Sequence, residues 1–408
     1  MLTNRILRIQ RLSTKIREYS SHAQATYPFT KLRAYPFRIS PEDAIVQIAP
    51  YASYVCMFQQ FLGSLGARFL PGFGFEPLRP VRITPVYFPG WFIDAEVSAD
   101  FNLKNVLSRG SGITQASYLP GSDFRVLSWV SYRFDGGPDP VPFTEELTRQ
   151  HGVDVTCIPY TISPFAAFDF VQSVTDPVQL HENVSFVPSS IHTGMFAAYP
   201  VLFPLYLAQY EYPFPGNERL VTFFLEAATL NGRIQTEKIV SGEVLRDRFT
   251  RDNFPQYFID LTHKLDDMDV PCMRGRPDYF FRFDGFKFLQ QRQIAPMMDC
   301  WLNDAVATSG VGQELAKRSG ILTSDADPRI RPFTVEERKA VQSWLALSEK
   351  IESLTRILES LQKTLVTQLV RDKRDNAIKS LEHKIAELKA KQNAVTPQWW
   401  EEWRHISQ

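Results

Sequence analysis

The sequence lacks an excess of charge of either sign. Its 408 residues include 45 Lys and Arg and 45 Asp and Glu, so the formal net charge at pH 7 is zero. Proteins that bind nucleic acids by neutralising phosphates normally carry more basic than acidic residues. We therefore expect no nucleic-acid partner.

Cysteine is also scarce, and its spacing does not suggest metal binding. No two of the four cysteines form a C-x-x-C pair: Cys56, Cys157, Cys272 and Cys300. This spacing argues against a zinc ribbon or a thioredoxin-type site. Four cysteines can form two disulfides, but a chain of this length does not need such cross-links to fold. We expect reduced and mostly buried thiols.

Long hydrophobic runs are missing. The charge-free stretch Ala44–Ala67 contains one proline, two glycines and three glutamines, and Pro200 and Pro204 interrupt the apolar run Met195–Leu207. A membrane-spanning helix needs about 20 predominantly apolar residues. We expect no transmembrane span. Peripheral contact with a membrane through Ala44–Ala67 stays open as an alternative.

The usual catalytic and nucleotide-binding motifs are absent as well. Gly72-Phe73-Gly74 and Gly110-Ser111-Gly112 lack the third glycine of a dinucleotide fingerprint and the lysine of a phosphate loop. The chain has no G-x-S-x-G elbow, and its histidines are isolated. We expect neither a cofactor nor a metal, and no catalytic residue can be assigned.

One pair of carboxylates raises the question of catalysis. Asp94 and Glu96 lie two residues apart in an expected strand and therefore on one face, where paired carboxylates can act as acid and base. The alternative is a solvent-facing acidic pair beside an aromatic core face, and we favour this alternative.

The amino terminus carries a clear pattern. Residues 1–17 contain five basic side chains and no acid, and their apolar residues recur at helical spacing. This amphipathic, arginine-rich pattern is typical of a mitochondrial transit peptide. Arg17, Tyr19 and Ser20 resemble the signal of the matrix processing peptidase, so residues 1–19 are predicted to be a cleaved presequence. A solvated basic helix on a cytosolic protein is the alternative.

Two short motifs occur twice in the same order. Pro36–Pro41 returns as Pro159–Pro164, and Pro85–Trp91 returns as Pro200–Tyr206. The two copies of the first motif lie 123 residues apart and those of the second lie 115 residues apart. The two spacings differ by no more than a small change in loop length. The shared order predicts a tandem duplication. Chance recurrence of proline-rich hexamers is the alternative.

The repeats, over 30–150 and 151–290, are each expected to hold a helix followed by antiparallel strands, which makes the fold class α+β. Ser40 is a suitable N-cap and Pro41 a suitable first helical residue. The prolines of the second motif indicate a strand entry or edge, and alternation from Trp91 onward indicates a strand. Further strands are expected at Val126–Phe134 and Leu220–Leu225, with a hairpin of Tyr279–Phe283 and Phe286–Leu289 around Asp284-Gly285.

The composition changes after Phe333, since no Phe follows it. A connector, 291–333, leads to a capping box that begins with Thr334 and opens a long helix. Residues 334–393 carry two heptad patterns out of phase, which favours an antiparallel helical hairpin or a coiled coil with a phase break. The first stripe includes Leu354, Leu358, Leu361 and Leu365.

The last segment, 394–408, is rich in tryptophan. Three tryptophans lie there without a core in the sequence to receive them: Trp399, Trp400 and Trp403. Because exposed tryptophans often anchor on a partner, this tail is expected to dock, together with the helical stripes, on another protein.

The stretch from Pro36 to Val97 resembles a domain of uncharacterised bacterial and plant zinc-ribbon proteins. There, a helix start of the form F-x-I-S-x-E-x-A precedes P-V-Y-x-P-x-W-x-x-D-A. The matching residues here are Phe37, Ile39, Ser40, Glu42 or Asp43, Ala44, Pro85, Val86, Tyr87, Pro89, Trp91, Asp94 and Ala95. The whole chain is similar to uncharacterised fungal mitochondrial proteins with the same order of motifs. The zinc ribbon is missing here, so the resemblance implies neither metal chemistry nor an established activity.

These features favour a non-catalytic protein of the mitochondrial matrix, an assembly factor or accessory subunit that contacts a protein partner through its C-terminal helices. The runner-up is an aromatic-lined protein that binds a small molecule or lipid between the two repeats, and that could be an enzyme. Peripheral attachment to the inner membrane is a third alternative.

Overall fold

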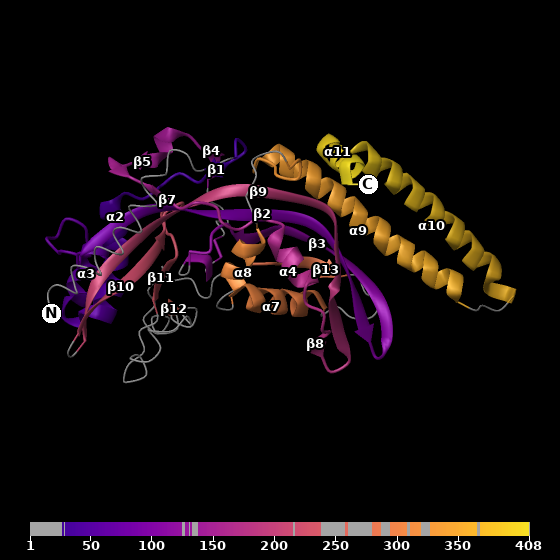
Figure 1. Ribbon diagram of the computed structural model, residues 1–408, viewed down its shortest axis with the longest axis horizontal. Helices are drawn as coiled ribbons and strands as arrows, with labels where there is room; N and C mark the ends of the chain where they lie inside the picture. Colours follow the sequence, from indigo (N-terminus) through magenta and orange to yellow (C-terminus); the bar gives the residue numbers. More distant parts are fainter. Residues whose placement is uncertain are drawn as a thin grey trace.

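The computed structural model describes most of the chain after the amino-terminal segment. The described residues are 27, 29–124, 127–129, 131–132, 138–214, 217–237, 258–259, 280–286, 294–307, 311–319, 327–364 and 368–407. They form a mixed α+β fold with one large sheet and a group of C-terminal helices (Figure 1). The predicted fold class is confirmed at this level.

Two long antiparallel strands form the centre of the sheet. β2 (Arg82–Leu103) pairs with β9 (Val184–Phe214), with Phe88 opposite Phe203 and Trp91 opposite Pro200. The sheet continues outward on both sides in the order β12-β11-β10-β9-β2-β3-β13. The outer strands are β3 (Val106–Pro120), β10 (Asn217–Glu226), β11 (Ile234–Glu237), β12 (Phe258–Ile259) and β13 (Phe283–Phe286).

The prolines Pro85 and Pro89 of β2 lie on the side of the strand where only a short strand pairs with it, so the N–H that proline lacks is not required there. Tyr87 directs its carbonyl to the short strand β7 (Thr156–Cys157), where it accepts from the N–H of Ile158 at 3.0 Å. Because backbone groups alternate in direction along a strand, Pro85 and Pro89 direct their nitrogens to that same side. The prediction of a strand entry or an edge is wrong, because Pro85 and Pro89 lie inside β2, a central strand, on the side that faces the short strand β7.

Short strands and turns complete the sheet. β1 (Arg33–Ala34) runs parallel to β9 and antiparallel to β4 (Val141–Pro142), and β8 (Val178–His181) pairs with β9. A separate ribbon joins β5 (Arg149–Gln150) to β6 (Val153–Asp154). Short 3₁₀ turns span Phe58–Gln60, Leu127–Trp129 and Glu145–Thr148.

Two strand predictions are wrong. Within the expected strand Val126–Phe134, residues Leu127–Trp129 form a 3₁₀ turn, because the chain turns back over the core there. Asp284-Gly285 does not form a hairpin turn but lies inside β13, where Gly285 with φ 148° accompanies a register shift against β3. The expected strand Leu220–Leu225 is confirmed within β10.

Matching contacts occur at the two copies of each motif. The indole N–H of Trp91 donates to the carbonyl of Ile162, and the hydroxyl of Tyr206 donates to the carbonyl of Ile39, both at 2.8 Å. The backbone hydrogen bonds also come in corresponding pairs. Tyr35 N–H donates to Leu202 O as Ile158 N–H donates to Tyr87 O, and Arg38 N–H donates to Ala227 O as Thr161 N–H donates to Gly121 O. In the third pair, Ala227 N–H donates to Pro204 O as Gly121 N–H donates to Pro89 O.

Helices cover the sheet. Ser40 accepts from the N–H of Asp43 and caps α2 (Pro41–Cys56), as the sequence predicts. α3 (Phe61–Phe69) follows it, and α4 (Ala166–Gln172) packs on β9 through the Phe168 and Phe196 rings, 5.6 Å apart. The expected connector contains α7 (Ile294–Ala307) and α8 (Val311–Arg318).

The centre of the sheet is filled with aromatic rings. Phe203 contacts Tyr118 and Tyr132, each with a centroid distance of 5.6 Å, and Phe88 contacts Tyr132 at 5.5 Å. A Cβ added to Gly90 would meet the Tyr118 ring at 2.6 Å and the Phe203 ring at 2.7 Å. Packing this close fills the space around Gly90 with side chains.

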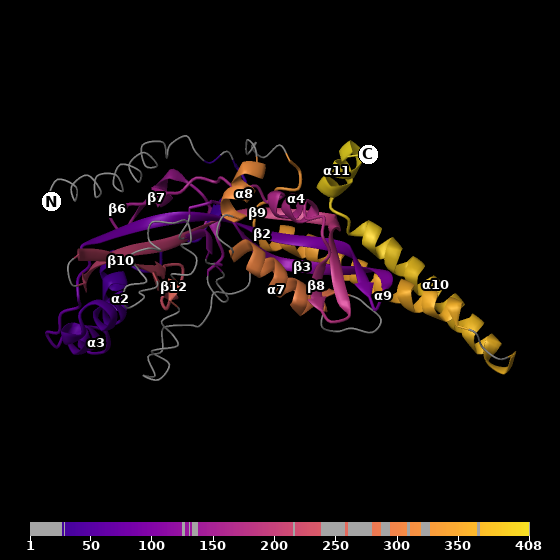
Figure 2. The same cartoon turned by 60° about the horizontal axis from the view of Figure 1, so that its bottom comes forward.

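The C-terminal helices form a projecting hairpin. α9 (Val335–Lys363) and α10 (Gln368–Ala394) lie side by side and extend away from the sheet, and α11 (Gln398–Ser407) folds back at their base (Figures 1 and 2). Of the two predicted alternatives, the hairpin is the one observed. No helix in the described ranges has the length and apolar character needed to cross a membrane.

Candidate functional site

The hairpin is fixed to the sheet at its base. The backbone N–H of Ala198 in β9 donates to Arg329 O at 2.9 Å, and the N–H of Arg331 donates to Ala198 O at 2.8 Å. The guanidinium of Arg331 then binds both carboxylate oxygens of Glu337, at 2.5 and 3.0 Å. Thr334 accepts from the N–H of Glu337 at 3.2 Å, so the predicted capping residue begins α9. This base sets the direction in which α9 leaves the body.

Further contacts hold α9 along the sheet. The hydroxyl of Ser348 donates to the carboxylate of Glu96 in β2. Arg356 donates to the Ser111 hydroxyl of β3 at 3.1 Å and pairs with Glu352 at 2.8 Å. These contacts hold α9 along the sheet as far as Arg356, and the far end of the hairpin extends past the sheet (Figure 1).

The tail tryptophans pack onto this base. Trp399 and Trp400 are 7% and 4% exposed and belong to the main core, and Trp400 stacks on Trp403 with centroids 4.7 Å apart. The Arg331 guanidinium lies 5.5 Å from the Trp399 ring, and Arg329 lies 4.8 Å from the Trp403 ring. The expectation that the chain has no core to receive these rings is therefore wrong for Trp399 and Trp400. Sequence alone misses this because the receiving arginines lie about 70 residues earlier in the chain.

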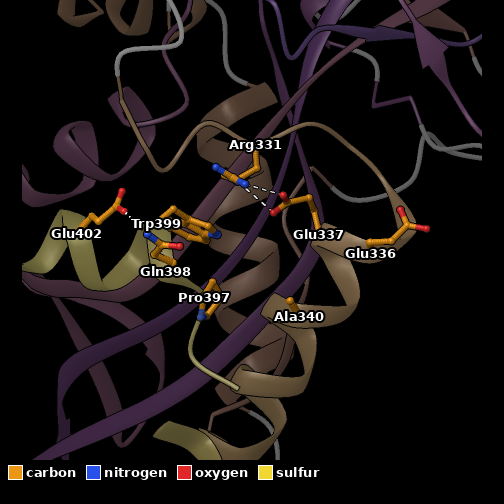
Figure 3. Close-up of a pocket in the computed structure, with 8 residues that line it drawn as sticks. All are labelled: Arg331, Glu336, Glu337, Ala340, Pro397, Gln398, Trp399 and Glu402. Atoms are coloured by element: carbon orange, nitrogen blue, oxygen red, sulfur yellow. Dashed lines mark hydrogen bonds and ion pairs between the residues drawn. The ribbon is translucent and has the colours of Figure 1, made fainter. Parts of the chain in front are cut away.

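A hollow of about 490 Å³ lies between the start of α9 and α11 (Figure 3). It is lined by Arg331, Glu336, Glu337, Ala340, Pro397, Gln398, Trp399 and Glu402. Two internal contacts, the Arg331–Glu337 ion pair and a 2.9 Å hydrogen bond from Gln398 to Glu402, engage most of its polar groups. The Glu337 carboxylate and the Trp399 ring already have Arg331 as their cationic partner, and the remaining carboxylate, Glu336, is exposed.

The expected leucine stripe is only partly covered. Leu354, Leu358 and Leu361 are half-buried between α9 and α10, whereas Ile385 and Leu388 of α10 are buried nearer the base. Leu365 lies outside the described residues. Ile357, on the same part of α9, is 44% exposed, so apolar surface stays partly accessible along the outer part of this helix.

The acidic pair Asp94 and Glu96 is not solvent-facing as we expected. Asp94 is fully buried and accepts from the N–H of Ala116 at 2.6 Å and from the Tyr199 hydroxyl at 3.3 Å. Burial raises the pKa of Asp94 and of Glu96, and the hydrogen bonds to Ala116 and Ser348 oppose this only in part. The alternation that suggested an outward face misleads because helix α9 covers this face of β2.

Each carboxylate has its own partners. Glu96 receives the Ser348 hydroxyl, and Asp94 holds the backbone of Ala116, whose φ of 48° belongs to a bulge between β2 and β3. Both groups therefore work as structural acceptors that join β2 to its neighbours. This arrangement gives no support to acid–base catalysis by the pair.

Other candidate residues are placed apart or lie outside the description. The processing residues Arg17, Tyr19 and Ser20 are outside the described residues. Cys56 and Cys157 are buried free thiols, and burial raises their pKa to about 12 and about 11. Within the described ranges, no group of three or more His, Cys, Asp or Glu side chains is arranged to hold a metal ion.

Comparison of the chain with known protein families, curated proteins and solved structures finds no match.

Proposed function

We propose that this protein is a non-catalytic protein of the mitochondrial matrix that acts through protein–protein contacts, as an assembly factor or accessory subunit. The observation that carries the proposal is the projecting α9–α10 hairpin, with its partly exposed apolar stripe and its firmly held base. Burial of partly exposed leucines against an apolar stripe of a partner helix drives association.

To test whether the hairpin is the docking element, positive charges are introduced into its leucine stripe. We expect Leu358→Lys combined with Leu361→Lys to release a tagged protein from its native complex while leaving the folded body intact, because the two side chains are only half-buried. The measurement is affinity purification from mitochondria followed by native mass determination.

Ser360→Lys with Gln362→Lys provides a matched control. It adds the same charge at two exposed positions of the same helix turns. If the control releases the partner as well, or if the stripe variant keeps it, the hairpin is not the docking element.

Import into the matrix rests on the basic, acid-free residues 1–17 and the following Arg17, Tyr19 and Ser20. We expect the mature chain to begin at Ser20, or one residue later after trimming. N-terminal sequencing of protein isolated from mitochondria measures this directly, and an intact Met1 contradicts import by this route.

We also propose that the body arose by tandem duplication, with an approximate two-fold axis at the Phe88–Phe203 pair. Support comes from the inner four strands, where β2 pairs with the next long strand β3 and β9 pairs with the next strand β10 on the opposite side. Further support comes from the reciprocal contacts of Trp91 with Ile162 and of Tyr206 with Ile39. In each contact the aromatic residue belongs to one repeat and the carbonyl to the other. The repeats are thus interlocked halves of one sheet.

A further inference from the structure

A second apolar surface lies far from the hairpin, at the opposite end of the molecule. Five large apolar side chains around α3 are exposed, and we call them the apolar cap: Phe58 at 66%, Leu62 at 76%, Phe69 at 49%, Leu70 at 49% and Phe73 at 76%. α3 and its loop protrude beyond the end of the sheet (Figures 1 and 2). A contiguous exposed patch of this kind on a folded protein normally marks an interaction site.

The cap is a built shape and not a loose loop. The Phe75 ring lies flat on Gly66 of α3, where an added Cβ would meet it at 2.5 Å. The Ser64 hydroxyl accepts from the N–H of Leu78 at 3.0 Å and ties the returning chain to the helix. Phe73 lies between two glycines with positive φ, Gly72 at 90° and Gly74 at 79°, and is thereby held at the tip of the turn.

The cap is convex and not a groove. A Cβ added at Gly72 or Gly74 would meet no atom within 4 Å, so the tip stands free of the rest of the chain. Helix α3 is amphipathic, with Phe61, Ser64 and Ala67 buried against the body and Leu62 exposed on the other side. A protruding apolar tip on an amphipathic helix fits a soft, flat apolar phase better than the surface of a second protein.

The charges around the cap favour one kind of surface. Residues 44–75 contain a single charged side chain, Arg68, and the exposed Glu76 follows them directly. Its guanidinium lies 5.6 Å from the Phe69 ring and 5.9 Å from the Tyr51 ring, and it donates to Gln47 O at 2.8 Å. Arg68 is thus held at the edge of the cap, where a cation attracts anionic lipid headgroups.

We infer that the apolar cap docks the protein peripherally on a lipid bilayer that contains anionic headgroups. Phe58, Leu62 and Phe73 enter the boundary between headgroups and acyl chains, and Arg68 lies at headgroup level. Docking at this end leaves the hairpin, at the other end, free to hold a partner. The inference stands on the cap alone and does not depend on the proposed role of the hairpin.

The experiment is flotation with vesicles of phosphatidylcholine and phosphatidylglycerol, using the full chain and a chain that begins at Ser20. Both are needed because the basic residues 1–17 can bind anionic vesicles by themselves. We expect the chain that begins at Ser20 to float with the vesicles, and Leu62→Ser with Phe73→Ser to weaken its partitioning by about tenfold or more. Both side chains are exposed, so the fold should tolerate the change.

Val106→Ser with Leu107→Ser is the matched control. These residues form the tip of the β2–β3 hairpin and are 62% and 69% exposed, so the control removes similar apolar surface elsewhere. We expect it to float like the unaltered chain. The inference is overturned if the chain that begins at Ser20 does not float, if the control loses binding equally, or if the cap variant floats unchanged. It is also overturned if the cap variant changes only the oligomeric state, since the cap then serves a protein contact.

Discussion

At the scale of single residues, the buried carboxyl of Asp94 contributes to the pH dependence of stability. Burial raises its pKa above the ordinary value of 3.8, which means that the folded chain holds this proton more tightly than the unfolded chain. The stabilisation from the protonated form is therefore complete below the ordinary pKa and is lost as the pH rises through the raised one.

Asp94→Asn should remove this loss. The amide keeps an acceptor for the N–H of Ala116 but does not titrate. The free energy of unfolding of the variant should therefore fall less than that of the unaltered protein as the pH rises from about 4 to about 8. Asp94→Ala, in contrast, leaves that buried N–H unpaired and should cost about 1–3 kcal/mol at any pH. Urea unfolding at several pH values measures both, and parallel pH profiles for Asp94→Asn and the unaltered protein would contradict the assignment.

At the scale of elements, α11 stabilises the base of the hairpin. Trp400 is 4% exposed, stacks on Trp403 and contacts Trp399 edge to face at the base of α9. Truncating a buried tryptophan costs about 3–5 kcal/mol, so Trp400→Ala should destabilise the protein by that amount. Removal of residues 394–408 should do at least as much, and should therefore loosen the hairpin base as well as any complex.

Denaturant unfolding measures the loss of stability in these variants, and the rate of protease cleavage between α9 and α10 measures whether the hairpin loosens. Arg404→Ala, at an exposed position of the same helix, is the control and should be within about 0.5 kcal/mol of the unaltered chain. A tail deletion that unfolds at the same denaturant concentration as the full chain would show that the tryptophans contribute nothing to the core.

At the scale of the whole molecule, the interlocked halves should fold only together. A chain that ends at residue 150 contains β2 but lacks β9, so the long edge of β2 and the apolar faces beside Phe88 lose their cover. Since a strand pair without its neighbours is marginal in water, we expect this fragment to show no cooperative unfolding transition. Circular dichroism and urea titration test this, with the full chain as reference, and a cooperative transition of the fragment would indicate two independent domains.

Local signals in the sequence determined several elements. Ser40 and Thr334 cap their helices because a capping side chain needs only a backbone N–H three residues away. The heptad pattern predicted the hairpin, and the recurring motifs around Trp91 and Tyr206 correctly indicated two strands. Each of these signals lies within a few residues of the structure it predicts.

The tertiary structure alone decided which surfaces are covered. Asp94 was expected to face solvent and Trp400 to face a partner, yet α9 covers the first and the chain's own base receives the second. The exposed cap around Leu62 and Phe73 likewise lies in a segment with a single charged residue, Arg68, that the sequence could not distinguish from core. Burial depends on which distant segments pack together, and a periodic pattern in one segment carries no information on its cover.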